Sequence, residues 1–97
     1  MAKGYWMSAY REIINADKLA AYVALAATAV QGNGGRFLVR GGQMQPKEDA
    51  VAERTVLVEF DSYEQALAAY ESPAYQEALK ALDGGVVRDL RIVEGVD

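Results

Sequence analysis

Residues 34–42 read GGRFLVRGG, a short segment of β-forming residues enclosed by two pairs of glycines. Glycine pairs favour tight turns, and a run of this kind between turn residues is typical of a strand, so residues 36–40 are predicted to form one. Successive side chains of a strand point to opposite faces of its sheet. Phe37 and Val39 are therefore expected on one face, and the other face would carry Arg36, Leu38 and Arg40.

The chain before this strand is predicted to form another strand and then a helix. Residues 5–10 are rich in aromatic and apolar residues and follow a glycine, which favours a first strand. Asn15 is a good helix N-cap, and the helix is expected to end in the glycine-rich run 32–35. Between them, apolar residues recur at the spacing of one helix face, namely Leu19, Tyr22, Val23, Ala26, Ala27 and Val30.

The chain after this strand is predicted to contain two more strands with a broken helix between them. Residues 54–60 alternate as a strand does, and residues 86–94 form the last strand. Ser62 with Gln65 three residues later has the pattern of a capping box. A second helix start is expected at Ser72, because proline follows it at the first helical position.

The predicted order is strand, helix, strand, strand, broken helix, strand. This is the order of the α+β ferredoxin-like fold, in which helices cover one face of an antiparallel sheet and leave the other face open. The length of 97 residues predicts a single domain over residues 1–97. A domain of this size buries a modest share of its surface, so association with a second copy would stabilise it.

The alternation of side chains separates a helix-facing set from an open-face set. The helix-facing set is uniformly apolar and consists of Phe37, Val39, Val56, Val58, Phe60, Leu90 and Ile92. The open face is expected to carry Arg36, Leu38, Arg40, Thr55, Leu57, Glu59, Asp89, Arg91 and Val93, together with Trp6, Ser8 and Tyr10.

The open face mixes large apolar groups with charges. A face washed by solvent would explain the charges, whereas an apolar patch flanked by polar residues commonly marks an interface. A second copy is the simplest partner, because two-fold dimers are the commonest assembly. The sequence therefore predicts a homodimer, with candidate interface residues Trp6, Leu38, Leu57 and Val93.

The pairing of the second and third strands can be predicted from charge. Arg36 opposite Glu59, Leu38 opposite Leu57 and Arg40 opposite Thr55 match charge with charge and apolar with apolar. On this register Arg36 is neutralised and Arg40 has no acid beside it. Arg40 would then need a carboxylate, a ligand anion or open water. Glu48, Asp49 or an acid across the dimer could supply the carboxylate.

Composition excludes several functions. The chain has no cysteine and no histidine, which excludes disulfides, thiolate nucleophiles, a Ser-His-Asp triad and the usual zinc sites. We expect no metal and no cofactor. A net charge of -4 disfavours nucleic acid and anionic membranes as partners. With no apolar stretch long enough to span a bilayer and no signal peptide pattern, the expected location is cytoplasmic.

The glycine-flanked string 34–42 also carries a family resemblance, together with residues 4–6, 58–60, 70–76 and 93–95. The chain resembles bacterial proteins grouped as domain of unknown function 1330, in the dimeric α+β-barrel superfamily. The resemblance implies a ferredoxin-like monomer whose sheet packs against that of its twin in a shared barrel, and it implies no established reaction. Cofactor-independent oxygenases and muconolactone-type isomerases belong to the same superfamily. The haem-degrading members of that superfamily depend on a histidine, and this chain has none.

Two possible ligand sites follow. Trp6 and Tyr10 could line a pocket with Arg40 for a small organic anion, preferably an aromatic one, although plain interface packing explains them too. The helix-stripe residues Tyr22, Tyr70 and Tyr75 could surround a second cavity, between helices and sheet, or could simply pack in the core. The sequence thus favours a metal-free binder or enzyme for a small organic anion. The alternative is a non-catalytic homodimer with a structural or interaction role.

Overall fold

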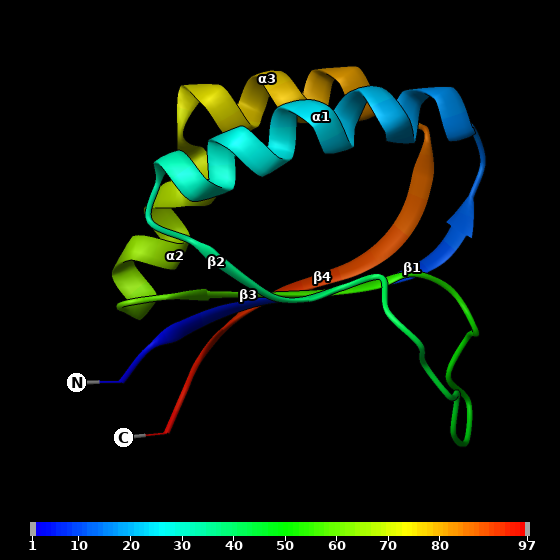
Figure 1. Cartoon of the computed structure of the whole chain (residues 1–97), viewed down its shortest axis with the longest axis horizontal. Helices are drawn as coiled ribbons and strands as arrows, with labels where there is room; N and C mark the ends of the chain where they lie inside the picture. The colour runs from blue at the N-terminus through cyan, green and yellow to red at the C-terminus, as the bar shows by residue number, and fades with distance from the viewer. Residues whose placement is uncertain (1, 97) are drawn as a thin grey trace.

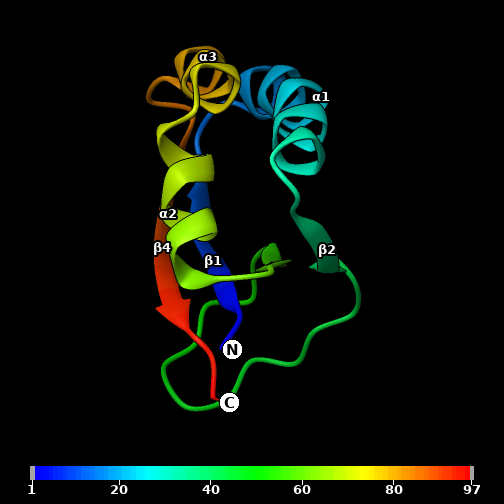
Figure 2. The ribbon, with the colours of Figure 1, turned by 90° about the vertical axis from the view of Figure 1, so that its left-hand side faces the viewer.

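The computed structural model describes residues 2–96 and has the predicted element order (Figure 1). The elements are β1 (Gly4–Ile13), α1 (Ala16–Gly32), β2 (Arg36–Arg40), β3 (Thr55–Phe60), α2 (Tyr63–Glu71), α3 (Pro73–Leu82) and β4 (Val86–Glu94). The strands form one antiparallel sheet in the order β2-β3-β1-β4. Helices α1 and α3 lie side by side over one face, and α2 lies beside β1 and β4 (Figure 2). The predicted ferredoxin-like α+β fold is confirmed.

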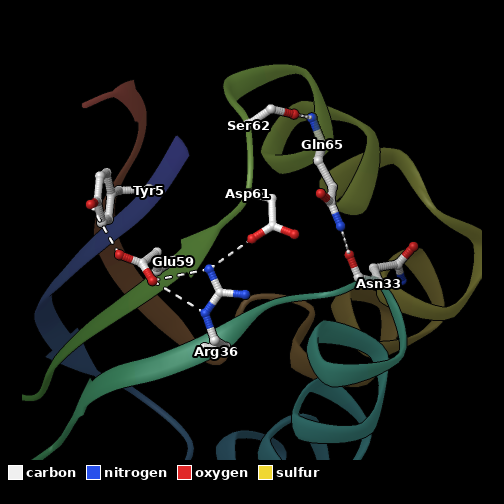
Figure 3. A network of polar contacts seen from close by, with 7 residues as sticks. All are labelled: Tyr5, Asn33, Arg36, Glu59, Asp61, Ser62 and Gln65. Atoms are coloured by element: carbon white, nitrogen blue, oxygen red, sulfur yellow. Dashed lines mark hydrogen bonds and ion pairs between the residues drawn. The ribbon is translucent and has the colours of Figure 1, made fainter. Parts of the chain in front are cut away.

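The helix starts follow the predicted capping residues. Asn15 Oδ1 accepts a hydrogen bond of 3.0 Å from the Lys18 backbone N–H, and Ser62 Oγ accepts one of 3.0 Å from that of Gln65. The Gln65 side chain does not complete the predicted capping box. Its Nε2 instead donates to the Asn33 carbonyl at 2.9 Å, which ties the start of α2 to the end of α1 (Figure 3).

Ser72 breaks the second helical segment as predicted. Its Oγ accepts from the Tyr75 backbone N–H at 3.3 Å and thereby caps α3, while Pro73 occupies the first turn. The end of α1 depends on glycine, because Gly34 has a φ of 85°. A Cβ on Gly35 would lie 2.6 Å from Val30 Cγ1. These glycines let the chain turn closely under α1 into β2.

Trp6 and Tyr10 of β1 face the helices, so their predicted position on the open face is wrong. Trp6 is 3% exposed, and its indole N–H donates to the Ala66 carbonyl of α2 at 2.9 Å. The pairing of Trp6 with Val58 on β3 and with Ile92 on β4 sets this orientation. Paired residues of neighbouring strands share a face, so the alternate positions Ser8 and Tyr10 face the helices as well. Trp6 therefore cannot contribute to an interface through the open face.

A β-bulge in β2 changes the predicted register. Arg36 pairs with Glu59 as predicted, but beyond Leu38 the partners shift, so that Val39 pairs with Leu57 and Arg40 with Val56. An extra residue on one strand exchanges the faces of the residues that follow it. Leu38 and Val39 are consequently 52% and 41% exposed. Arg40, predicted on the open face, moves to the helix side.

None of the helices within residues 2–96 is long and apolar enough to cross a membrane.

Candidate functional site

A pocket lies between the helices and the strongly curved sheet. Its walls are mostly apolar side chains of α1 and of the helix-facing sheet residues, and they include Trp6. The enclosed part has a cavity volume of about 40 Å³, and the space widens to about 450 Å³ when the part open to solvent is included. Polar side chains from five elements and the loop before β3 also line it, namely Ser8, Tyr10, Tyr22, Arg40, Arg54, Tyr75 and Arg88.

Arg88 organises the buried end of this pocket. It pairs with Tyr10 across β1 and β4, and therefore points toward the helices. Its Nη1 donates to Tyr22 Oη at 3.1 Å and to Tyr10 Oη at 3.4 Å, and its Nη2 donates to Tyr75 Oη at 3.0 Å. Tyr22 Oη and Tyr75 Oη lie 2.7 Å apart and share a hydrogen bond. The guanidinium also lies 5.0 Å from the centroid of the Tyr22 ring.

The charge at this end is not balanced by a carboxylate. No aspartate or glutamate lines the pocket, and none of the ion pairs within residues 2–96 involves Arg88. Burial by itself would lower the pKa of Arg88, but the oxygens of Tyr22 and Tyr75 outweigh this effect and raise it. Burial, reinforced by Tyr22, also raises the pKa of Tyr75. Arg88 is therefore a permanent cation, and Tyr75 keeps its proton, at any physiological pH.

Arg40 and Arg54 line the more open part of the pocket. The guanidinium of Arg40 lies 4.5 Å from the centroid of the Phe37 ring and makes no ion pair in the described part of the chain, so the acids of the adjacent loop do not hold it. Arg54 Nε is buried and, like the buried Ser8 Oγ, has no hydrogen-bond partner among the described residues. The Arg54 guanidinium lies against Gly41, where a Cβ would approach Nη1 to 2.8 Å.

The predicted site residues fall into one pocket instead of two. Arg40, Trp6 and Tyr10 join Tyr22 and Tyr75 between helices and sheet. Tyr70 is outside the lining and packs its ring against those of Trp6 and Tyr75, with centroids 5.9 and 5.2 Å away. The predicted interface residues Leu38, Leu57 and Val93 do not line it.

Sequence reasoning missed Arg54 and Arg88. Each lies two residues before a predicted helix-facing residue, Val56 in β3 and Leu90 in β4. Because strand side chains alternate between the two faces, both arginines fall on the helix side. A charged residue in this otherwise apolar set could have marked them as candidate site residues.

No group of three or more Asp, Glu, His or Cys side chains in residues 2–96 is arranged to hold a metal ion.

The fold and the pocket define a ferredoxin-like α+β protein, and comparison with solved structures agrees. A protein of unknown function from Rhodopseudomonas palustris has a TM-score of 0.70 at 18% identity, over 96% of this chain and 80% of that one. SnoaB, a cofactor-independent oxygenase from Streptomyces nogalater, has a TM-score of 0.68 at 10% identity, over 100% and 96%. A dimeric ferredoxin-like protein of unknown function from Thermobifida fusca has a TM-score of 0.62 at 13% identity, over 98% and 92%.

The family is shown by sequence. The family described as Domain of unknown function (DUF1330) matches residues 3–96, so the chain belongs to it, as the resemblance predicted. The chain matches no curated protein.

Proposed function

We propose that the pocket between the helices and the sheet binds a small organic anion without the help of a metal. The observation that carries the proposal is the presence of Arg40, Arg54 and Arg88 in one pocket with no acidic residue in its lining. For Arg88, at the buried end, an uncompensated guanidinium costs several kcal/mol. Bound carboxylate would offset that cost and would accept hydrogen bonds from the planar forks of the arginines.

The pocket also contains groups that could act on such an anion. A cation holds the substrate's charge, and a phenolic hydroxyl can donate a proton to it. Tyr22 is the candidate donor, because burial raises the pKa of Tyr75 and because the Tyr22 hydroxyl contacts both Arg88 and Tyr75. If the protein is an enzyme, Tyr22 acts as the acid that protonates the bound anion. Binding of the anion without reaction is the simpler form of the proposal.

A separate observation favours the homodimer. The open face of the sheet carries exposed apolar side chains at Met7, Leu38, Val39 and Val93. Exposed apolar groups gathered on one face mark an interface more often than a solvated surface. Structurally similar proteins from Thermobifida fusca and Bacteroides fragilis are described as dimeric. We infer that two copies associate through this face, whether or not the protein is an enzyme.

The anion proposal is tested by titrating the protein with acetate, benzoate and succinate while its fluorescence is recorded. Trp6 lines the pocket and is the only tryptophan in the chain, so the emission reports from this place. At least one anion is expected to bind saturably. Arg40→Ala should weaken it about tenfold and Arg40→Lys less, since lysine keeps the charge but loses the fork. Absence of saturable binding by every carboxylate would overturn the proposal.

A further inference from the structure

The buried end of the pocket has more hydrogen-bond donors than acceptors. The hydroxyl oxygens of Tyr10, Tyr22 and Tyr75 each accept a bond from Arg88. Tyrosine hydroxyls are ordinarily protonated at neutral pH, so these groups bring one proton each. The bond between Tyr22 and Tyr75 uses a single proton. The remaining hydroxyl protons have no acceptor in the described part of the chain, and the group that satisfies them must offer lone pairs.

The more open end of the pocket has a donor surplus of its own. Ser8 Oγ and Arg54 Nε are both buried without a partner among residues 2–96. Arg40 adds a second guanidinium at this end without an acid to balance it.

The sheet keeps the two donor groups apart. The Tyr10 backbone N–H donates to the Arg54 carbonyl at 2.9 Å on one side of β1, and Tyr10 pairs with Arg88 of β4 on the other side. Arg54 and Arg88 are thus on opposite sides of β1. Neighbouring strands are about 4.8 Å apart, which puts their backbones roughly 10 Å from each other. The Arg88 guanidinium is held by the hydroxyls of Tyr22 and Tyr75, whereas the Arg54 guanidinium lies against Gly41, so the two groups serve different parts of the pocket.

We propose that the ligand is a compact dicarboxylate, with one carboxylate at Arg88 and Tyr22 and the other at Arg54 and Arg40. This inference rests on the proposed function, which it deepens by naming the class of anion. A carboxylate is an acceptor at both oxygens and so matches a surplus of donors, whereas an amide or amine end would add further donors. A monocarboxylate would leave one of the two ends of the pocket without an anion.

The size of the pocket agrees with a short ligand. A buried water needs on the order of 10–15 Å³ of space available to its centre. An enclosed cavity of about 40 Å³ is therefore small, which suits one carboxylate end of a short ligand. The rest of the ligand would lie in the part that is open to solvent, where Arg40 is exposed.

The test compares dicarboxylates with their monoamides, which have nearly the same shape and one charge less. Malonate, succinate and glutarate and the matched monoamides are titrated by calorimetry against the wild-type protein. The tightest dicarboxylate is expected to bind at least about tenfold more strongly than its monoamide, because a hydrogen bond to a charged group is lost with the second carboxylate. Equal affinities would overturn the dicarboxylate assignment and leave the proposed function standing. Failure of all the anions to bind would overturn both.

Two variants test the carboxylate that is placed at the buried end. Tyr22→Phe removes one hydroxyl and no charge, and is expected to weaken the dicarboxylate about tenfold. Tyr70→Phe is its matched control, since Tyr70 is outside the pocket lining, and it should bind like wild type. Thermal unfolding confirms that both variants fold. Equal affinities of the two variants for the dicarboxylate would show that no carboxylate reaches Tyr22 and would overturn the assignment.

Discussion

The two arginines at the ends of β2 have opposite surroundings. Arg36 makes ion pairs of 3.0 Å with Glu59 and 3.1 Å with Asp61, and Glu59 also accepts from the Tyr5 hydroxyl at 3.1 Å (Figure 3). Arg40, four residues later, makes no ion pair within residues 2–96. The bulge at Leu38 separates them, because it turns Arg40 from the open face to the pocket.

The difference distinguishes a structural arginine from one that we propose binds a ligand. Hydrogen bonds to Glu59 and Asp61 raise the pKa of Arg36, and the same pairing holds the pKa of Glu59 below its ordinary value. These groups satisfy one another and need nothing further. Arg40, Arg54 and Arg88 have cationic charge and spare donors but no acid, an arrangement that a bound anion would complete.

The largest effect is expected from removing the charge at the buried end. Arg88→Met keeps an unbranched side chain but deletes the guanidinium, so anion binding should fall at least about a hundredfold, as a buried charge-assisted pair is lost. Calorimetry measures the affinity. Arg36→Met is the matched control and should bind like wild type, because its charge is already paired. Equal losses in the two variants would mean that general surface charge, not the pocket, attracts the anion.

The next effect concerns the open face of the sheet, where the bulge in β2 leaves Leu38 and Val39 exposed. Leu38→Asp would place a carboxylate in the proposed dimer interface at a cost of a few kcal/mol, enough to dissociate the dimer at micromolar concentration. Light scattering measures the mass of both proteins. A wild-type protein that is monomeric at tens of micromolar would show that this face does not form a dimer interface.

The sequence was sufficient for the element order and for part of the register. The bounds of β2 and β4 were predicted to the residue, and so was the pairing of Arg36 with Glu59, because an opposite charge pair favours one alignment. The bulge could not be predicted. Leu38 and Val39 are both apolar, so the hydrophobic pattern does not tell which of them faces the helices and which faces away.

The same ambiguity explains the errors at the site. Residues 5–10 carry aromatic or apolar side chains in both phases of the strand, so alternation alone does not tell which set faces the helices. The position of Trp6 is set by pairing with Val58 and Ile92, which is a long-range contact. Arg88 and its tyrosines come together from four elements, and such a cluster exists only after the helices have packed.

The smallest effect is expected in the paired network. The pKa of Glu59 is lowered in the folded protein, chiefly by its hydrogen bond with Arg36, so the stabilisation is present above the ordinary glutamate pKa and is lost as pH falls through the lowered value. Arg36→Ala should therefore lower the melting temperature slightly at neutral pH, and the difference from wild type should vanish in acid. A difference that persists at low pH would assign the effect to packing of the Arg36 stem.

The contrast between paired and unpaired arginines is tested most directly by nuclear magnetic resonance of the arginine Nε–H groups during a titration with succinate. The signals of Arg54 and Arg88 should shift saturably with a single dissociation constant, while that of Arg36 stays in place. Succinate that leaves Arg54 and Arg88 unshifted, or that moves Arg36 as much as Arg88, would contradict a dicarboxylate site between the helices and the sheet.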